Sequence, residues 1–305
     1  MSRILVVGDL MLDEYVDGDV DRISPEAPVP ILNCKTVSRS LGGAGNLVAN
    51  LVGLGHIPYV LGAVGSDYAG GLISEILSEL GVPFDFIKVQ VGRTTTRKTR
   101  FCSSGQHILR ADKEIVGCVD LFNEVESLGE FDYVIVSDYA KGVVTIDLLS
   151  ELKNRFLYKS TLILDPNINN LDIYNDLDEV MFDYITPNIH EAKAFNNRKD
   201  SSIKSIARNL TRLSNNIIIT LGKDGVFALE RSFPKGLKAE YIHKQIKHKP
   251  IDIVDVSGAG DTVVATFVDG LIKGMSFFDA VEYSQKMASI VVSKRGTYAI
   301  RKEDI

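Results

Sequence analysis

Two glycines and two carboxylates stand close together in the segment Asp255-Val-Ser-Gly-Ala-Gly-Asp261. The segment follows an apolar run at residues 251–254 and precedes an amphipathic stretch at residues 262–272, an order that predicts a strand, a tight turn and a helix. The first amides of a helix lack an intrahelical acceptor and, together with the helix dipole, attract anions. Gly258 and Gly260 have no Cβ, so the backbone can approach a ligand closely.

Asp261 is poorly suited to binding an anion at this turn, because its carboxylate would repel the anion. It is well suited to act as a base that takes a proton from a hydroxyl attacking a phosphoryl group. The segment therefore indicates phosphoryl transfer. The alternative interpretation is a plain glycine-rich turn with an exposed Asp at the start of a helix.

Two further segments carry groups suited to sugar hydroxyls. Leu41-Gly-Gly-Ala-Gly-Asn46 precedes a predicted helix, and its spacing does not match the dinucleotide-binding GxGxxG pattern. Asn46 can donate and accept hydrogen bonds, or it can simply cap the helix. Asp9 and Asp13 follow the first predicted strand, at the end that faces the ligand crevice in parallel sheets, although an Asp-rich turn would also explain them.

The segments Asn188-Ile-His-Glu191 and Thr220-Leu-Gly-Lys-Asp-Gly225 are candidates for contacts with a nucleotide and its metal. Asn188 and Glu191 have the spacing of a helix capping box, and the functional alternative is a water-mediated Mg²⁺ site. The second segment is either a plain hairpin turn or a loop that contacts phosphate or ribose through Thr220 and Gly222.

Basic residues cluster in the polar segment that ends near residue 112. Arg97, Lys98, Arg100 and Arg110 suit an anionic substrate, whereas charges of this kind also protect solvated strand edges. Lys98 and Arg100 are two residues apart and would share one strand face. Asp138 and Lys141 follow another predicted strand, where they would order a phosphate or a loop. These sets of charged and glycine residues need a framework that brings them to one edge of a sheet.

The composition excludes several classes of protein. With 305 residues, 45% apolar residues and 24% charged residues, the chain can bury a large core and is not disordered. A net charge of −6 argues against a general nucleic-acid binder. Three cysteines without CxxC spacing, no signal peptide and no apolar run of membrane length predict a cytoplasmic protein that does not enter a membrane.

Short apolar runs alternate with helical periodicity, which predicts an α/β fold with a mostly parallel sheet. The expected strands are residues 4–7, 59–63, 133–136, 162–164, 184–186 and 217–220. The expected helices are residues 45–54, 68–80, 145–156, 188–195, 201–213 and 277–293. We expect a single domain over residues 1–305. Residues 13–35 and 84–112 break the alternation and predict a small β-sheet that lies over the active site, pairs with another subunit, or both.

The chain resembles the ribokinase-like (PfkB) carbohydrate kinases over essentially its whole length. Gly42-Gly-Ala-Gly-Asn46 and residues 255–261 resemble the two signatures of that family, and Asn188–Glu191 resembles its NxxE element. A narrower resemblance is to the heptose 7-phosphate kinases. It rests on Gly8-Asp-Leu-Met-Leu-Asp13, Arg22-Ile-Ser-Pro-Glu-Ala-Pro-Val-Pro30, Ser137-Asp-Tyr-Ala-Lys-Gly142 and Asp165-Pro-Asn167.

The resemblance implies a three-layer α/β/α sandwich with a β-sheet lid, and ATP-dependent phosphorylation of D-glycero-D-manno-heptose 7-phosphate at its C1 hydroxyl. It implies Asp261 as the base, with the amides of Gly258, Ala259 and Gly260 holding the transferred phosphoryl group. The implied sugar contacts are Asp9, Asp13, Gly42, Gly43, Asn46 and Asp138, with Lys98, Arg100 and Arg110 on the 7-phosphate. The implied contacts to ATP and Mg²⁺ are Lys141, Asn188, Glu191, Thr220, Gly222 and Gly225.

The resemblance also implies a homodimer formed through the lid. Many relatives carry a fused nucleotidyltransferase domain; because this chain ends at Ile305, we expect a separate nucleotidyltransferase to act downstream, in the synthesis of ADP-heptose for surface polysaccharide. Leu41 and Val48 depart from the N-terminal signature, which leaves the identity of the sugar open. Another sugar or sugar phosphate, such as ribose or fructose, is the nearest alternative. A non-catalytic sensor on the same fold is the other, although a sensor has no need of a base.

Overall fold

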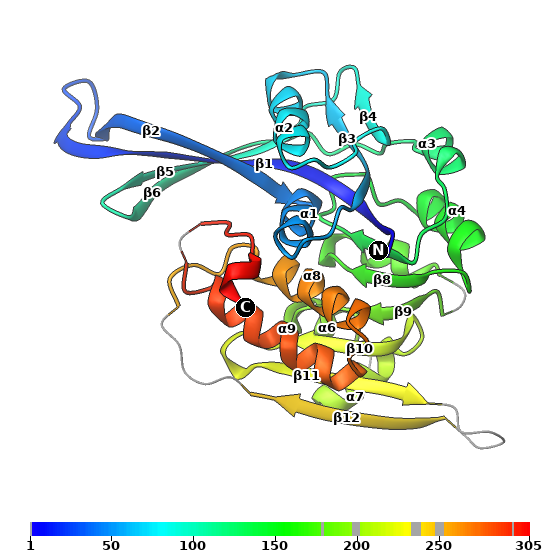
Figure 1. The fold of residues 1–305 in the computed structure, drawn as a ribbon. Helices are drawn as coiled ribbons and strands as arrows, with labels where there is room; N and C mark the ends of the chain where they lie inside the picture. The colour runs from blue at the N-terminus through cyan, green and yellow to red at the C-terminus, as the bar shows by residue number, and fades with distance from the viewer. Residues whose placement is uncertain (1, 178–179, 197–201, 233–238, 248–252, 295) are drawn as a thin grey trace.

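The computed structural model describes residues 2–177, 180–196, 202–232, 239–247, 253–294 and 296–305. A mostly parallel sheet lies at the centre, and a second group of strands projects from it (Figure 1). The strands are β1 (Ile4–Ile23), β2 (Pro30–Gly43), β3 (Tyr59–Gly65), β4 (Ile87–Gln90), β5 (Thr96–Ser103), β6 (Gln106–Lys113), β7 (Tyr133–Ser137), β8 (Thr161–Asp165), β9 (Phe182–Ile185), β10 (Ser214–Thr220), β11 (Val226–Ser232) and β12 (Glu240–Ile246). The helices are α1 (Ala44–Gly53), α2 (Tyr68–Glu79), α3 (Phe122–Ser127), α4 (Ile146–Phe156), α5 (Leu171–Asn175), α6 (Ile189–Ala194), α7 (Ile203–Leu210), α8 (Ala259–Ile272) and α9 (Phe277–Val291).

The central sheet has the strand order β12-β11-β10-β9-β8-β7-β1-β3-β4. Neighbouring strands from β4 to β10 pair in parallel. The pairs β10–β11 and β11–β12 are antiparallel. Parallel strands have their carboxyl ends at the same edge of a sheet, which is where ligands bind in this class of fold. The expected mostly parallel α/β architecture is confirmed.

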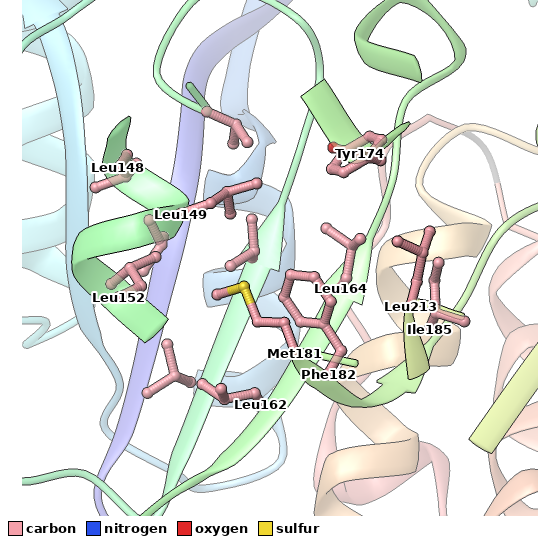
Figure 2. Close-up of a cluster of buried hydrophobic side chains, with 14 of the residues drawn as sticks. Leu148, Leu149, Leu152, Leu162, Leu164, Tyr174, Met181, Phe182, Ile185 and Leu213 are labelled. Carbon is pink, nitrogen blue, oxygen red and sulfur yellow. The ribbon is translucent and has the colours of Figure 1, made fainter. Parts of the chain in front are cut away.

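Helices cover both faces of this sheet. On one face, α3, α4, α6 and α7 pack on side chains of β7, β8, β9 and β10, and Figure 2 shows part of this core around Leu149, Leu164 and Phe182. On the other face, α1, α2, α8 and α9 pack on the alternate side chains of the same strands. Because both faces of the central strands are covered, those strands are continuous apolar runs. No helix within the described residues combines the length and the apolar character needed to cross a bilayer.

Strand β1 belongs to two sheets. Its first half pairs in parallel with β3 and β7, whereas from Leu10 onward it pairs with β2 and β5. Strands β2, β1, β5 and β6 form the projecting sheet, which we call the lid (Figure 1). The first strand was expected to end at residue 7, so Asp9 and Asp13 lie within β1 rather than after it.

The lid also differs from its expected limits. Its first segment, expected to end at residue 35, continues to Gly43. Its second segment, expected to begin at residue 84, begins at Thr96, because Ile87–Gln90 pairs with β3 in the central sheet. The strand expected at residues 251–254 is absent from its described part, since Ile253 and Val254 lie outside any strand and are exposed. Residues 251 and 252 lie outside the described residues, as does Ser201 of the expected helix 201–213. That helix is observed as Ile203–Leu210.

Candidate active site

Asp261 lies in the first turn of α8, at the carboxyl edge of the central sheet, and only 3% of its surface is exposed. Both of its oxygens accept hydrogen bonds from side chains of other elements. Asn46 Nδ2 in α1 donates to Oδ2 at 2.7 Å, and the Tyr139 hydroxyl donates to Oδ1 at 2.8 Å. Each carboxylate oxygen retains a second lone pair for a further donor. The carboxylate is therefore held in one orientation before any substrate arrives.

Gly258 makes the close approach of Asn46 possible. It caps α8 with φ of 79°, a left-handed conformation that favours glycine. A Cβ at this position would lie 2.5 Å from Asn46 Nδ2. Asn46 is itself fixed by Asn50, whose Nδ2 donates to the Asn46 carbonyl at 2.8 Å. The Asn50 Oδ1 in turn accepts from Thr262 Oγ1 at 3.0 Å, so helices α1 and α8 are joined by buried polar bonds.

The amino end of α8 opens onto a cavity of about 560 Å³. The amides of Gly260 and Asp261 have no backbone acceptor among the described residues, as expected for a first helical turn. The amide of Ala259, which was expected to hold the phosphoryl group, instead donates to the Val256 carbonyl at 3.2 Å. The cavity is lined by Thr220, Gly222, Lys223, Gly225, Ile253, Val256, Ala259, Gly260, Val263, Gln285, Ala288, Ser289 and Val292.

This cavity brings together two segments singled out in the sequence, the loop at residues 220–225 and the turn before α8. Gly222 and Gly225 have φ of 58° and 87°, so the loop needs glycine at both places. A Cβ on Gly225 would lie 2.0 Å from the Ile246 carbonyl oxygen. The plain-hairpin interpretation explains these conformations, but it does not explain why the loop forms the wall of an apolar cavity beside unpaired amides.

Several carboxyl groups at this edge of the sheet are difficult to ionise. Burial, together with the charge of the nearby Asp13, raises the pKa of Asp261 to about 6, although the hydrogen bonds from Asn46 and Tyr139 and the charge of Lys98 act in the opposite direction. Burial likewise raises the pKa of Glu191 to about 7. The pKa of Asp165 is raised well above its usual value by burial and by the charges of Glu191 and Asp261. Such a concentration of negative charge favours a bound cation.

Asp9 was expected to contact a sugar, but its carboxylate is buried under the loop that follows β7. Its oxygens accept from the amides of Tyr139, Lys141 and Val143 at 3.1, 3.0 and 3.0 Å. Gly43 is equally constrained, since a Cβ there would lie 2.4 Å from the Asp9 carbonyl oxygen. Asp9 therefore positions this loop through three amides, and its contact with a sugar stays a prediction.

Asp138 and Lys141 also contribute to the structure of that loop. Asp138 accepts from Asn170 Nδ2 at 3.0 and 2.8 Å and from the hydroxyl of Tyr174, which accounts for the loop-ordering alternative. Burial raises the pKa of Asp138 to about 6. Lys141 Nζ forms an ion pair with Glu114 at 2.9 Å, and its contact with a nucleotide stays a prediction.

Asp13 and Arg100 connect the lid to the C-terminal segment. Arg100 NH1 donates to Asp13 Oδ1 at 2.5 Å, and only 8% of Arg100 is exposed. Asp13 Oδ2 accepts from Thr297 Oγ1 at 3.1 Å. A Cβ on Gly42 would lie 2.7 Å from the same oxygen, so the glycine leaves room for Asp13. The predicted sugar contact Asp13 and the predicted phosphate contact Arg100 are thus paired with each other.

Lys98 is a lid cation whose charge acts on Asp261. Its Nζ lies 5.7 Å from the centre of the Tyr139 ring, and its charge lowers the pKa of Asp261. Arg110 lies opposite Arg100 on β6, is exposed and forms an ion pair with Asp112 at 2.9 Å. Arg97, on the opposite lid face, lies 4.0 Å from Glu14. Within the described residues, Lys98 is thus the member of this basic set whose charge acts on the Asp261 carboxylate.

Asn188 and Glu191 form the capping box that their spacing predicted. Asn188 Oδ1 accepts from the amides of His190 and Glu191, and the Asn188 amide donates to Glu191 Oε2 at 2.8 Å. Among the described residues, no three His, Cys, Asp or Glu side chains converge closely enough to hold a metal directly. Mg²⁺ commonly keeps several waters and binds through one or two carboxylates, so this donor set fits a water-mediated ion better than a protein cage.

Two residues of the site were not predicted from the sequence. Tyr139 donates to Asp261, and Asp165 contributes to the acidic edge. Asp165 carries a recognisable signal, because it ends β8 at the carboxyl edge of a parallel sheet. Tyr139 follows β7 by two positions, but its direction depends on loop contacts that local sequence does not reveal.

The profile of the pfkB family carbohydrate kinases matches residues 1–304. The chain belongs to this family. The bifunctional protein HldE of Desulfatibacillum aliphaticivorans is 38% identical over 317 residues, a match that covers 99% of this chain and 62% of that protein. The chain spans about three fifths of the length of the curated relatives it matches. Family membership identifies a sugar kinase and confirms the kinase predicted from Asp261 and its turn.

Two solved structures that are similar to this chain have the same fold. Phosphofructokinase-2 of Escherichia coli superposes with a TM-score of 0.76 at 16% identity, covering 100% of this chain and 97% of that one. Ribokinase of Thermotoga maritima gives a TM-score of 0.72 at 20% identity, covering 100% and 98%. The ribokinase-like α/β fold expected from the resemblance is confirmed.

Proposed function

We propose that this kinase transfers the γ-phosphoryl group of ATP to the C1 hydroxyl of D-glycero-D-manno-heptose 7-phosphate. In this reaction the sugar oxygen forms a bond to the γ-phosphorus, and the bond from that phosphorus to the β,γ-bridging oxygen breaks. The products are heptose 1,7-bisphosphate, ADP and one proton. The observation that carries the proposal is a buried carboxylate, Asp261, beside unpaired helix amides at the mouth of an apolar cavity.

In this proposal Asp261 accepts the proton of the attacking hydroxyl. A base works best when its pKa is near the working pH, and burial raises the pKa of Asp261 to about 6. At neutral pH most of the enzyme then carries the ionised base. The proton passes to the carboxylate as the new oxygen–phosphorus bond forms, and the amides of Gly260 and Asp261 stabilise charge on the transferred group.

ATP fits the cavity at the amino end of α8. An apolar surface for the adenine ring of ATP is provided by the side chains of Ile253, Val256, Val263 and Val292. Thr220 and Gly222 lie on the same cavity at the end of β10, where a hydroxyl and a backbone amide can meet ribose or phosphate. The phosphates then extend toward the unpaired amides of α8, whose dipole favours negative charge.

Asn188 and Glu191 would hold Mg²⁺ through water. Their position beside Thr220 is set by the contact of the Thr220 amide with the Pro187 carbonyl at 3.1 Å. When bound, the ion would neutralise charge on the nucleotide phosphates. It would also relieve the repulsion from neighbouring carboxylates that adds to burial in raising the pKa values of Glu191 and Asp165.

Three observations support the sugar phosphate as substrate. Lys98 lies on the lid face next to Tyr139 and Asp261, with Arg100 and Arg110 farther along the same face. The segments that resemble heptose 7-phosphate kinases include Ser137-Asp-Tyr-Ala-Lys-Gly142, which forms the loop over the base. Relatives at 33–38% identity over nearly the full chain are named bifunctional protein HldE.

The lid supports the proposal of a homodimer. Strand β6 is exposed along its whole length, and β2 is exposed over most of its length. Exposed apolar side chains on these strands and the turns beside them include Ile23, Val29, Val37 and Leu109. Two lids packed face to face would cover these surfaces. The free thiols of Cys34, Cys102 and Cys118 support a reducing, cytoplasmic location, where a nucleotidyltransferase activity would use the product.

A substrate panel tests the proposal. ADP release is measured with heptose 7-phosphate, free heptose, ribose, fructose and fructose 6-phosphate at matched concentrations. We expect the highest kcat/KM for heptose 7-phosphate. A preference for ribose or fructose would retain the sugar kinase and reject this substrate. Absence of turnover with every sugar, combined with tight sugar binding, would favour a sensor.

A further inference from the structure

The loop that follows β7 has an unusual construction. It is anchored by two buried carboxylates, Asp9 and Asp138, which are 1% and 3% exposed. Asp9 accepts from three amides of the loop, and Asp138 accepts from the Ala140 amide at 2.7 Å. Ala140 has φ of 54°, in the left-handed region that non-glycine residues seldom adopt. Burying two carboxylates and straining one residue are costly, which indicates that the loop holds something in place.

Tyr139 is the residue that this construction presents to the active site. Its amide is one of those bound by Asp9, so its backbone is fixed, and its hydroxyl reaches Asp261 Oδ1 at 2.8 Å. Burial and the negative charge of Asp261 raise the pKa of Tyr139 well above its usual value. The phenol therefore keeps its proton at neutral pH and acts as a donor, never as a competing base.

Asn46 occupies the other oxygen of Asp261, and the direction of its amide is fixed independently. Asn50 Nδ2 donates to Asn46 Oδ1 at 3.3 Å, so the Asn46 amino group must face Asp261. The carboxylate is thus held by one neutral donor on each oxygen. Asn46 comes from α1, which packs beside α8, whereas Tyr139 comes from the loop after β7, so the two donors are built separately.

We propose that Tyr139 is a positioning residue for the kinase reaction: its hydroxyl orients the Asp261 carboxylate and keeps it ionised, so that it can accept the proton of the sugar hydroxyl. This inference rests on the proposed role of Asp261 as the base. Nothing in the family match or in the relatives' names assigns a role to Tyr139. During the reaction Tyr139 keeps its own proton and donates the same hydrogen bond throughout.

Other charged groups face Asp261 and must be included in the expected pH dependence. Asp13 on β1 raises the pKa of Asp261, as burial does, whereas Lys98 on β5, Asn46 on α1 and Tyr139 lower it. Asp165 at the end of β8 also interacts with Asp261 electrostatically. A hydrogen bond to the ionised form lowers the pKa of an acid, so removing the Tyr139 donor must raise the pKa of Asp261. A residue that only fills space would leave that pKa unchanged.

The first test is Tyr139→Phe, which keeps the ring and removes the donor. The acidic limb of the kcat/KM profile should move upward by about one pH unit. At pH 8 kcat should fall on the order of tenfold because the base is less well oriented, with KM for ATP unchanged. Tyr133→Phe is the matched control, since Tyr133 lies at the opposite end of β7 and should give a wild-type profile.

A second variant has the opposite expected sign. Incorporation of 3-fluorotyrosine at position 139 makes the phenol a stronger donor, so the acidic limb should move to lower pH while activity at pH 8 is retained. ¹³C NMR titration of the Asp261 carboxyl, assigned with Asp261→Asn, measures the same pKa without any turnover. Shifts of opposite sign in the two variants support the inference.

An Asp261 carboxyl pKa that is the same in wild type and Tyr139→Phe overturns the inference, whatever happens to kcat. A wild-type rate in Tyr139→Phe at pH 8 with an unmoved acidic limb overturns it as well. Failure of the proposed base gives a different result. In that case Asp261→Asn keeps its activity, although the carboxyl pKa still responds to Tyr139.

Discussion

The two sides of the active site are built in different ways. On the side of the central sheet, Asp261, Asn46 and Tyr139 come from different elements and are joined by short hydrogen bonds. On the lid side, Lys98 and Arg110 extend from a thin sheet that has solvent on much of its surface. The buried side suits the chemical step, which needs fixed geometry. The lid side suits recognition of a charged group on the sugar.

This difference predicts separate kinetic consequences. Substitutions on the sheet side should lower kcat, because they disturb groups that act in the transition state. Substitutions on the lid side should lower kcat/KM for the phosphorylated sugar more than for ATP. The Asp13–Arg100 pair bonds to Thr297 and so forms a buried connection between the lid and the C-terminal segment. The following predictions, in order of decreasing effect, test whether this division holds.

Asp261→Asn should have the largest effect. Removal of a general base typically costs about 10²–10⁴ in rate, and Asn keeps the shape of the side chain. We expect kcat to fall by at least that factor while calorimetry shows nearly normal binding of ATP and sugar phosphate. A variant that retains more than about a tenth of wild-type kcat would contradict the role of Asp261 as the base, since that loss is below the range for a base.

Gly258→Ala and Gly260→Ala form a matched pair on the same turn. At Gly258 the φ of 79° is left-handed, and a Cβ would lie 2.5 Å from Asn46 Nδ2. We expect a loss of about 1–2 kcal/mol in the free energy of unfolding and at least a tenfold lower kcat, because Asn46 must move away from Asp261.

A Cβ on Gly260 meets nothing within 4 Å, so that variant should be as stable as wild type and should change mainly KM for ATP. Denaturant melts and steady-state kinetics measure both variants. Equal effects at the two positions would mean that the contact of Asn46 with the base is unimportant.

Lys98→Ala tests the lid side. A charge-assisted contact to phosphate is worth about 1.5–3 kcal/mol, so kcat/KM for heptose 7-phosphate should fall roughly 10- to 150-fold. KM for ATP and turnover of free heptose should change little. Lys204→Ala, in the exposed part of α7, is the control. An equal loss with the ester and the free sugar would show that Lys98 acts on the base through its charge and does not bind the phosphate.

Glu191→Gln should have the smallest effect. It removes one negative charge but can keep the hydrogen bond to the Asn188 amide. We expect a several-fold increase in the Mg²⁺ concentration that gives half-maximal rate, because a water-mediated site loses one carboxylate. If Glu191 only caps α6, the Mg²⁺ dependence stays the same. The free energy of unfolding alone then decreases, by at most about 0.5–2 kcal/mol.

The sequence predicted the buried side of the molecule well. Strands β7, β8 and β10 were located within a few residues, because strands covered on both faces are apolar runs. The helix after Gly258 and the capping box at Asn188 were also evident, since they follow from local backbone requirements. Such features depend on neighbours in sequence.

The lid and the polar contacts were harder to predict. After Gly8 the acidic and apolar residues of β1 follow no regular alternation, so the pattern does not show that the strand continues into a second sheet. The carboxylate of Asp9 suits a sugar and a loop amide equally well. Its actual partner is set by the return of the chain at Tyr139, far away in sequence. The pairing of Arg100 with Asp13 was not predicted for the same reason, because the two residues are far apart in sequence.

The central claim is phosphorylation of a sugar phosphate at its anomeric hydroxyl, and ³¹P NMR of the product tests it most directly. Wild-type enzyme is incubated with ATP, Mg²⁺ and D-glycero-D-manno-heptose 7-phosphate, and the spectrum is followed to completion. The account predicts ADP and a new phosphate signal coupled to the anomeric proton, in equal amounts, with the 7-phosphate signal retained. A new phosphate coupled to any other proton of the sugar, or an unchanged 7-phosphate spectrum alongside rapid turnover of a neutral sugar, would contradict it.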